Sequence, residues 1–201
     1  MLKMGLTGGI ASGKSAVAAM LREMGFPVLE ADVVAHQFLE PGQAAHDEVL
    51  REFGADLADA AGRIDRGKLG ALVFADPAKL EKLNHIIHPR VEEVVWKKFE
   101  EWQRDGVRDA GFVEAALLVE AGIADKLDGL VVAFCLPEQQ LERLRARGMS
   151  ESEAKRRIAA QLPVEEKLDQ ATEAIDCSGT LEETRAQVAA LAAKLRKRAR
   201  G

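Results

Sequence analysis

Apolar residues in this chain of 201 residues follow two patterns, short continuous runs and stretches with helical spacing. Runs at 2–6, 26–29, 111–115, 129–136 and 174–177 predict five β-strands. Between them, apolar positions recur every three or four residues, which indicates amphipathic helices. The run at 129–136 is unbroken, as expected for a central strand covered on both faces. We therefore predict an α/β fold with a parallel sheet of about five strands flanked by helices.

The segment between the first strand and the first helix is rich in glycine. Its residues Gly8-Gly9-Ile10-Ala11-Ser12-Gly13-Lys14-Ser15 match the phosphate-loop pattern G-x-x-x-x-G-K-[ST]. Glycines let the backbone aim several N–H groups at one point, and the helix N-terminus adds partial positive charge. The alternative is a glycine-rich turn without a ligand, but a Lys-Ser pair at a helix start has little purpose there. The predicted ATP-binding residues of this segment are Gly8, Gly9, Ala11, Ser12, Gly13, Lys14, Ser15 and Ala16.

Two of these residues carry side chains suited to phosphate chemistry. Lys14 is predicted to reach the β- and γ-phosphates, and the Ser15 hydroxyl is predicted to ligate Mg²⁺. Glu114 and Glu120 lie near the end of the third predicted strand. Either glutamate helps to hold Mg²⁺ through water, or both are simply solvated.

Asp32 lies just past the end of the second predicted strand. Ligands of parallel sheets bind beyond the carboxyl ends of the strands, so Asp32 is a candidate catalytic carboxylate facing a nucleotide in the loop. The alternative is an N-cap for the helix predicted at 33–38. Position alone leaves both interpretations open, and both can hold at once.

The stretch from 41 to 106 is almost wholly helical and interrupts the alternation of strands and helices. We interpret the chain as one domain, with a core at 1–40 and 107–201 and an insert at about 41–106. Pro89 is predicted to kink or restart a helix that begins at Pro77. In a small phosphotransferase, such an insert would bind the second substrate. His88 either contacts that substrate or packs at the helix kink.

Arginines flank a glycine break after the fourth strand. Arg143 and Arg147 precede Gly148, and further arginines follow at 156 and 157. This pattern predicts a mobile lid at about 143–165 that closes over the γ-phosphate and brings positive charge to the transferred group. The alternative is an ordinary amphipathic helix with solvated charges.

Composition excludes several classes of protein. A net charge of −5 with 47% hydrophobic residues indicates a soluble, mildly acidic protein without a nucleic acid or a membrane as its main partner. The basic tail at 194–200 is interpreted as a solvated helix end, with nucleic-acid binding as the alternative. No apolar run approaches the roughly 18 residues of a membrane-spanning helix. Cys135 and Cys177 have no metal-binding spacing, and buried thiols in a cytoplasmic protein are expected.

Other features separate kinases from switch proteins. The guanine-specific pattern N-K-x-D is impossible because Asn84 is the only asparagine. Asp176-x-x-Gly179 matches the D-x-x-G pattern of GTPases, but it lies near the end of the chain and no further GTPase motif follows it. A motor or transporter ATPase would need a longer chain, so a small kinase is favoured.

Several segments, taken in order, resemble the dephospho-CoA kinase family over nearly the whole chain. Besides the loop, they are Val28-Leu29-Glu30-Ala31-Asp32, Glu40-Pro41-Gly42, Leu69-x-x-x-Val73-Phe74, His88-Pro89, Leu117-Leu118-x-Glu120, Gln140-Leu141-x-Arg143-Leu144-x-x-Arg147, Ala160-Gln161 and Ile175-Asp176-x-Ser178-Gly179. The chain departs from the family's pattern at other positions. The departures are Ala16, Glu30, Glu114, Ala116, Val119, Thr172 and Cys177.

This resemblance implies a P-loop kinase that phosphorylates the ribose 3′-hydroxyl of dephospho-CoA with ATP and Mg²⁺. Asp32 would orient that hydroxyl and accept its proton, while Arg143 and Arg147 would bind ATP and stabilise the transferred charge. His88 and Leu117 would contact dephospho-CoA, and the protein would be a monomer or a weak homo-oligomer. The alternatives are a kinase of another small alcohol or nucleoside monophosphate, and a nucleotide-binding module without turnover.

Overall fold

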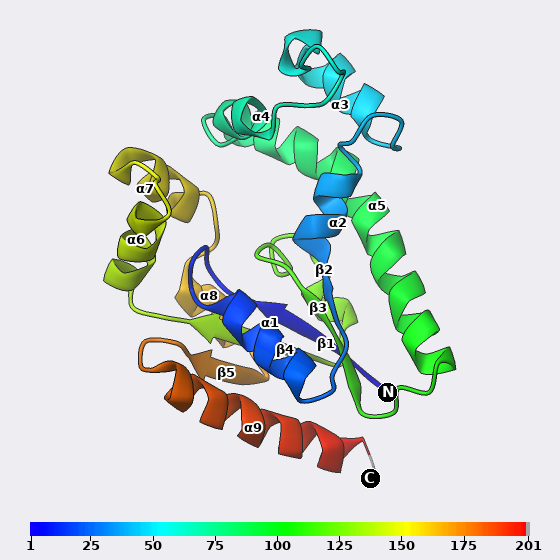
Figure 1. Ribbon diagram of the computed structural model, residues 1–201, viewed down its shortest axis with the longest axis vertical. Helices are drawn as coiled ribbons and strands as arrows, with labels where there is room; N and C mark the ends of the chain where they lie inside the picture. The colour runs from blue at the N-terminus through cyan, green and yellow to red at the C-terminus, as the bar shows by residue number, and fades with distance from the viewer. Residues whose placement is uncertain (200–201) are drawn as a thin grey trace. The chain divides into compact units, whose positions relative to one another are not determined.

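The computed structural model describes residues 1–199 as two compact units (Figure 1). One unit contains residues 1–30 and 95–199, and the other contains residues 31–94. The second unit therefore begins earlier than the predicted insert at 41–106 and ends inside a continuous helix. Among the described residues, no helix combines the length and apolar character needed to cross a membrane.

A parallel sheet forms the centre of the first unit, with strand order β2-β3-β1-β4-β5. The five strands predicted from apolar runs are confirmed. Their bounds are β1 Leu2–Thr7, β2 Val28–Glu30, β3 Ala110–Glu114, β4 Gly129–Phe134 and β5 Glu173–Asp176. Leu6 of β1 pairs with Glu114 of β3 and with Val131 of β4. This register brings the carboxyl ends of the three central strands to one edge, where ligands of such sheets bind.

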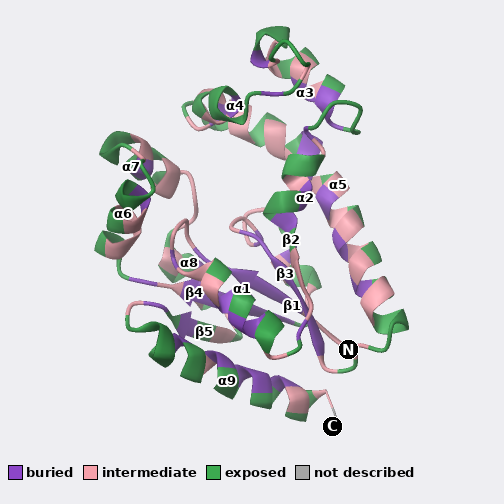
Figure 2. Ribbon diagram, in the orientation of Figure 1, coloured by how far each residue is buried: buried purple, intermediate pink, exposed green. Residues whose placement is uncertain are grey.

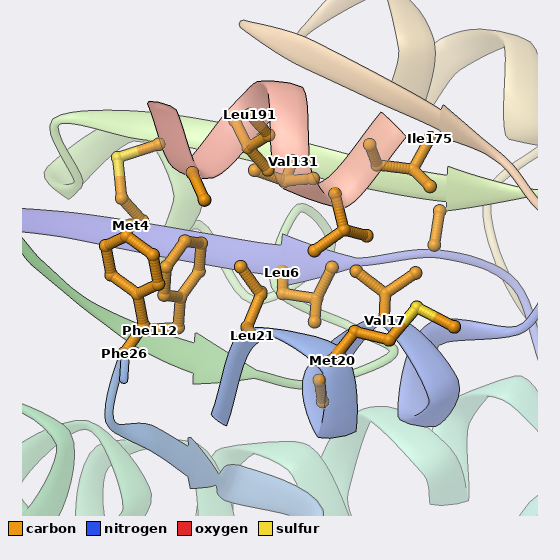
Figure 3. Close-up of a cluster of buried hydrophobic side chains, with 14 of the residues drawn as sticks. Met4, Leu6, Val17, Met20, Leu21, Phe26, Phe112, Val131, Ile175 and Leu191 are labelled. Atoms are coloured by element: carbon orange, nitrogen blue, oxygen red, sulfur yellow. The ribbon is translucent and has the colours of Figure 1, made fainter. Parts of the chain in front are cut away.

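Helices α1 (Lys14–Glu23) and α9 (Leu181–Arg198) cover one face of the sheet and build the main core (Figure 3). Leu6 and Leu21 are completely buried there, and the rings of Phe26 and Phe112 meet edge to face at 5.8 Å. Gly25, with φ 88°, follows the C-cap residue Met24 of α1, a position where glycine commonly ends helices.

The basic end of α9 packs against other segments of the first unit. Arg196 places its guanidinium 5.1 Å from the centre of the Phe26 ring and lies 3.6 Å from Asp109. Lys194 pairs with Glu173 of β5. The described part of the basic tail is therefore the end of α9, with some of its side chains paired within this unit, and Arg200 lies outside the described residues.

The second face of the sheet is covered by the end of α5 (Pro77–Arg104), α8 (Val164–Asp169) and the turns around η2 (Ala124–Lys126). A Cβ on Gly111 of β3 would lie 2.7 Å from the Trp102 ring. A Cβ on Gly5 of β1 would lie 2.9 Å from Leu127 and Leu130. Bulky side chains therefore press directly on glycine backbone at this face.

The second unit is wholly helical apart from its turns and one isolated bridge. It contains α2 (Ala31–Gln37), α3 (His46–Phe53), η1 (Ala55–Leu57), α4 (Arg66–Val73) and the first part of α5. Asp65 caps α4 by accepting from the backbone N–H groups of Gly67 and Lys68. A kink or a restart is predicted at Pro89, and the helix does not restart there, because α5 continues from Pro77 to Arg104 with Pro89 inside it.

The segment predicted as a lid is a pair of helices in the first unit. Helices α6 (Pro137–Ala146) and α7 (Glu151–Ala159) pack together, and each buries one residue, Leu144 in α6 and Ala154 in α7. Gly148, with φ 84°, lies in the turn between them. Figure 2 shows that much of both helices is exposed, whereas the central strands β1, β3 and β4 are mostly buried.

Candidate active site

The phosphate loop runs from the end of β1 at Thr7 to the start of α1 at Lys14. Gly8 has φ 154°, Ala11 φ 58° and Gly13 φ 105°. A Cβ on Gly8 would lie 2.1 Å from the Ala133 carbonyl oxygen, and a Cβ on Gly13 would lie 2.7 Å from that of Cys177. The glycines are therefore needed for space as well as for conformation, and the resulting turn is the concave backbone arrangement that binds anions.

Glu114 joins the two functional side chains of the loop. Its Oε1 atom lies 2.9 Å from Lys14 Nζ and accepts a hydrogen bond of 3.3 Å from Ser15 Oγ. The glutamate is 4% exposed, so this ion pair is almost shielded from water. The strand pairing explains the contact, because Glu114 ends β3 beside the end of β1. The interpretation of Glu114 as a solvated residue is wrong.

Ser15 and Glu114 also provide a donor set for a magnesium ion. Mg²⁺ prefers oxygen ligands and is commonly held by one or two carboxylates together with substrate phosphates. A hydroxyl and a carboxylate within hydrogen-bond reach of each other, beside an anion-binding turn, fit that chemistry. No group of three or more candidate metal-binding side chains occurs among residues 1–199, so this pair is not part of a larger cage.

Side chains of the α6–α7 segment bind the backbone of the loop. Gln140 Nε2 donates to the Ile10 carbonyl oxygen at 3.0 Å, and Gln161 Oε1 accepts from the Ile10 N–H at 2.8 Å. Arg143 donates to the Ala11 carbonyl oxygen at 3.1 Å and to that of Cys177 at 2.9 Å. Both ends of the predicted lid therefore contact the loop directly.

Arg147, predicted to act beside Arg143, is exposed at the C-terminal cap of α6. Arg143 is therefore the arginine of this predicted pair that the structure places on the loop. Arg143 donates from the body of α6 to backbone carbonyl oxygens, whereas Arg147 lies about one helical turn further on, at the helix end beside Gly148.

Two buried thiols lie beneath the loop, as expected for both cysteines. Cys135 directs its Sγ atom at the Ala11 carbonyl oxygen, 3.9 Å away. Burial raises the pKa of Cys177 to about 11 and also raises that of Cys135. Thiols with a raised pKa stay protonated and act as small packing groups.

Glu120 and Lys167 form a second, largely buried ion pair near the loop. Lys167 is completely buried, and its Nζ atom lies 2.8 Å from Glu120 Oε1 and 2.7 Å from the Ala116 carbonyl oxygen. The interpretation of Glu120 as a solvated residue is therefore wrong. Sequence reasoning missed Lys167, because a lysine among the charges of Val164-Glu165-Glu166-Lys167 looks like any solvated helix residue.

Asp32 lies in the first turn of α2, two residues after β2 ends at Glu30. The helix begins at Ala31, so the interpretation of Asp32 as its N-cap is wrong. Asp32 is exposed and His88 is half-buried, and both belong to the unit 31–94. Leu117 lies in the first unit, half-buried in the turn after β3, where its carbonyl oxygen accepts from the Ala121 N–H.

A groove of about 480 Å³ lies in the unit 31–94, between α3 and the first part of α5. Arg51, Lys82 and His85 contribute to its lining. Lys82 pairs with Glu52 across this groove. His88 does not line it.

Comparisons with known proteins agree on one family. A model of dephospho-CoA kinases matches residues 2–183. A dephospho-CoA kinase of Symbiobacterium thermophilum is 44% identical over 187 residues, covering 92% of this chain and 78% of that protein. The crystal structure of TT1252 from Thermus thermophilus is 37% identical with a TM-score of 0.78, covering 96% and 97%. A dephospho-CoA kinase from Campylobacter jejuni is 25% identical with a TM-score of 0.70, covering 97% of both chains.

Proposed function

Because the chain belongs to the dephospho-CoA kinase family, we propose that it transfers the γ-phosphoryl group of ATP to the ribose 3′-hydroxyl of dephospho-CoA, giving CoA and ADP. The observation that carries the proposal is the family match over residues 2–183. The arrangement of Lys14, Ser15 and Glu114 at the end of a parallel sheet supports it, because phosphoryl transfer needs positioned positive charge more than covalent chemistry.

ATP is held by the phosphate loop in this proposal. Backbone N–H groups from Gly8 to Ala16 surround the β- and γ-phosphates, and Lys14 exchanges its contact with Glu114 for the phosphate oxygens. Ser15 and Glu114 would hold Mg²⁺, which neutralises charge on the phosphates when it is bound. The buried carboxylate keeps both side chains oriented before the nucleotide arrives.

Arg143 stabilises the charge that develops on the transferred group. Two of its donors bind backbone carbonyl oxygens of Ala11 and Cys177, which fixes the planar guanidinium beside the loop. The remaining N–H groups stay available for phosphate oxygens. Arg147 joins this role when the exposed end of α6 approaches the nucleotide.

Asp32 orients the 3′-hydroxyl and accepts its proton during transfer. Its place directly after β2 supports this role, since ligands of parallel sheets bind beyond the strand ends. His88 and Leu117 contact the acceptor, and the helical unit provides most of its binding surface. A kinase of another small alcohol or nucleoside monophosphate is the alternative, and it would use the same loop with a different acceptor.

We also propose that the protein acts in the cytoplasm as a monomer or weak homo-oligomer. Free, buried cysteines support a reducing compartment. The large apolar side chains exposed among the described residues are Val33, Leu136 and Leu181. They are too few to suggest an extensive apolar interface.

The position of the new phosphate tests the proposed reaction. The purified protein is incubated with ATP, Mg²⁺ and dephospho-CoA, and the product is identified by mass and by ³¹P NMR. We expect one added phosphate that a 3′-nucleotidase removes. A phosphate at the 2′-hydroxyl, or no product, would contradict the proposal.

A further inference from the structure

Lys167 is the buried residue of α8, and its ammonium group has no exposed surface. Burying an ammonium group is costly unless other groups compensate for the lost water. Here the Glu120 carboxylate at 2.8 Å and the Ala116 carbonyl oxygen at 2.7 Å provide that compensation. The lysine thereby connects α8 to two points of the loop that follows β3.

The same carboxylate binds the end of the predicted lid. Glu120 Oε1 accepts a hydrogen bond of 3.0 Å from the backbone N–H of Leu162. The preceding residue, Gln161, holds the Ile10 N–H of the phosphate loop. On the other side, the Ala116 carbonyl oxygen also accepts from Thr7 Oγ1 at 3.2 Å, one residue before the loop begins. The buried pair therefore reaches the phosphate loop from both sides.

Glu120 Oε2 is buried without a hydrogen-bond partner among the described residues. An unsatisfied carboxylate oxygen lowers stability, and a well-packed apolar pair is often as stable as a buried ion pair. Stability alone is therefore a weak reason for this arrangement. The geometry of the pair instead fixes the position of Leu162, and therefore of Gln161, where the chain leaves α7 and comes back to the phosphate loop.

We propose that Lys167 and Glu120 are positioning residues that hold the return of the lid, Gln161-Leu162, against the phosphate loop. Neither side chain touches the reacting groups; they act through Gln161 and Ile10 on the backbone that binds ATP. This inference rests on the proposed function for its effect on turnover, but its effect on nucleotide binding is independent of the acceptor.

Three variants separate positioning from simple stabilisation. Lys167→Met leaves the Glu120 charge buried and unpaired, so its melting temperature falls. The double variant Lys167→Met/Glu120→Gln removes both charges and keeps an acceptor for Leu162, so we expect its melting temperature to recover. Its KM for ATP stays raised by about tenfold or more, because the α8 anchor remains lost. Gln161→Ala, which removes the last link, raises the KM for ATP similarly without touching the buried pair.

The kinetic pattern distinguishes the two roles. A purely structural pair changes the fraction of folded protein, which lowers kcat and leaves both KM values unchanged. The positioning role raises the KM for ATP and leaves the KM for dephospho-CoA within about twofold. Arg185→Met/Glu23→Gln is the control, because it removes an exposed ion pair between α9 and α1 in the same unit. We expect wild-type KM values for this control.

Two further measurements do not depend on the acceptor. The first is the affinity for a non-hydrolysable ATP analogue, and the second is the rate of tryptic cleavage at the exposed Arg145, Arg147, Lys155 and Arg156. The double variant is expected to bind the analogue about tenfold more weakly and to be cleaved faster than the control at equal melting temperature. Wild-type affinity and cleavage in the double variant would overturn the inference. A wild-type protein that fails to phosphorylate dephospho-CoA would contradict the proposed function and leave these two results to decide the inference.

Discussion

Lys14 makes one ionic interaction in the structure and would make a second in the proposed reaction. It pairs with the buried Glu114 and, in the proposed reaction, with the phosphates of ATP. We expect Lys14→Ala to lower kcat/KM by at least about a hundredfold, because a preorganised positive charge next to the transferred group is lost. Initial rates of ADP release test this prediction, with Lys197→Ala on the exposed side of α9 as the control. A fully active Lys14→Ala would contradict the assignment of the phosphate loop.

The proposed role of Asp32 as general base is tested by comparing its substitution with the same kind of substitution at a neighbouring acidic residue. Asp32→Asn keeps the size of the side chain and removes its ability to accept a proton. We expect kcat to fall by about 10²- to 10⁴-fold, with little change in the KM for ATP. Glu30→Gln is the matched control, because Glu30 ends β2 and forms an exposed ion pair with Arg22. An unchanged kcat in Asp32→Asn would contradict its role as general base.

At the scale of single elements, the turn between β1 and α1 depends on its glycines. Gly13 and Gly25 both have positive φ, but a Cβ on Gly13 would collide with Cys177, whereas nothing lies within 4 Å of one on Gly25. Gly25→Ala is expected to cost about 1 kcal/mol, from backbone conformation alone. Gly13→Ala is expected to cost more and to abolish ATP binding. Thermal unfolding and titration with ATP compare the two variants. Equal losses of stability and of ATP affinity in both would contradict the predicted collision between a Cβ at position 13 and Cys177.

His46, at the start of α3, predicts a pH dependence of stability in the unit 31–94. Its Nδ1 atom lies 2.7 Å from Asp47 Oδ1, and its Nε2 atom lies 2.7 Å from the Gly62 carbonyl oxygen. Both partners are acceptors, so they favour the imidazolium, and the hydrogen bond to Asp47 is the main cause of its raised pKa. The stabilisation is present below pH about 6.5 and is lost as the pH rises through the folded pKa.

The variant His46→Gln isolates this contribution. Burial lowers the pKa of His36, which gives the opposite pH dependence but is common to both proteins. We expect the wild type to exceed His46→Gln in melting temperature by more at pH 6 than at pH 9. A difference that stays constant over this range would show that the imidazole is not charged in the folded state.

The elements were largely predictable because their signals are local. Apolar runs identified all five strands, and the loop pattern identified the turn before α1. Asp32 and Pro89 show the limit of local signals, since helix α2 begins two residues earlier than the predicted start at residue 33 and α5 continues through its proline. The contacts of Glu114, Gln161 and Lys167 depend on pairing between distant segments, which single-sequence patterns do not encode.

At the scale of the whole molecule, the proposed reaction assigns the nucleotide to the unit built on the sheet and the acceptor mainly to the helical unit 31–94. The loop, Glu114 and Arg143 belong to the first unit, and Asp32 and His88 to the second. In this proposal, phosphoryl transfer occurs only when ATP and the acceptor are bound at the same time. The same organisation explains why the identity of the acceptor cannot be deduced from the phosphate loop.

ADP release from MgATP, measured with and without dephospho-CoA, tests this account most directly. Parallel reactions replace dephospho-CoA with AMP, CMP or shikimate. We predict strong stimulation by dephospho-CoA and none by the other acceptors. Equal rates with and without dephospho-CoA, or stimulation by another acceptor instead, would contradict the account.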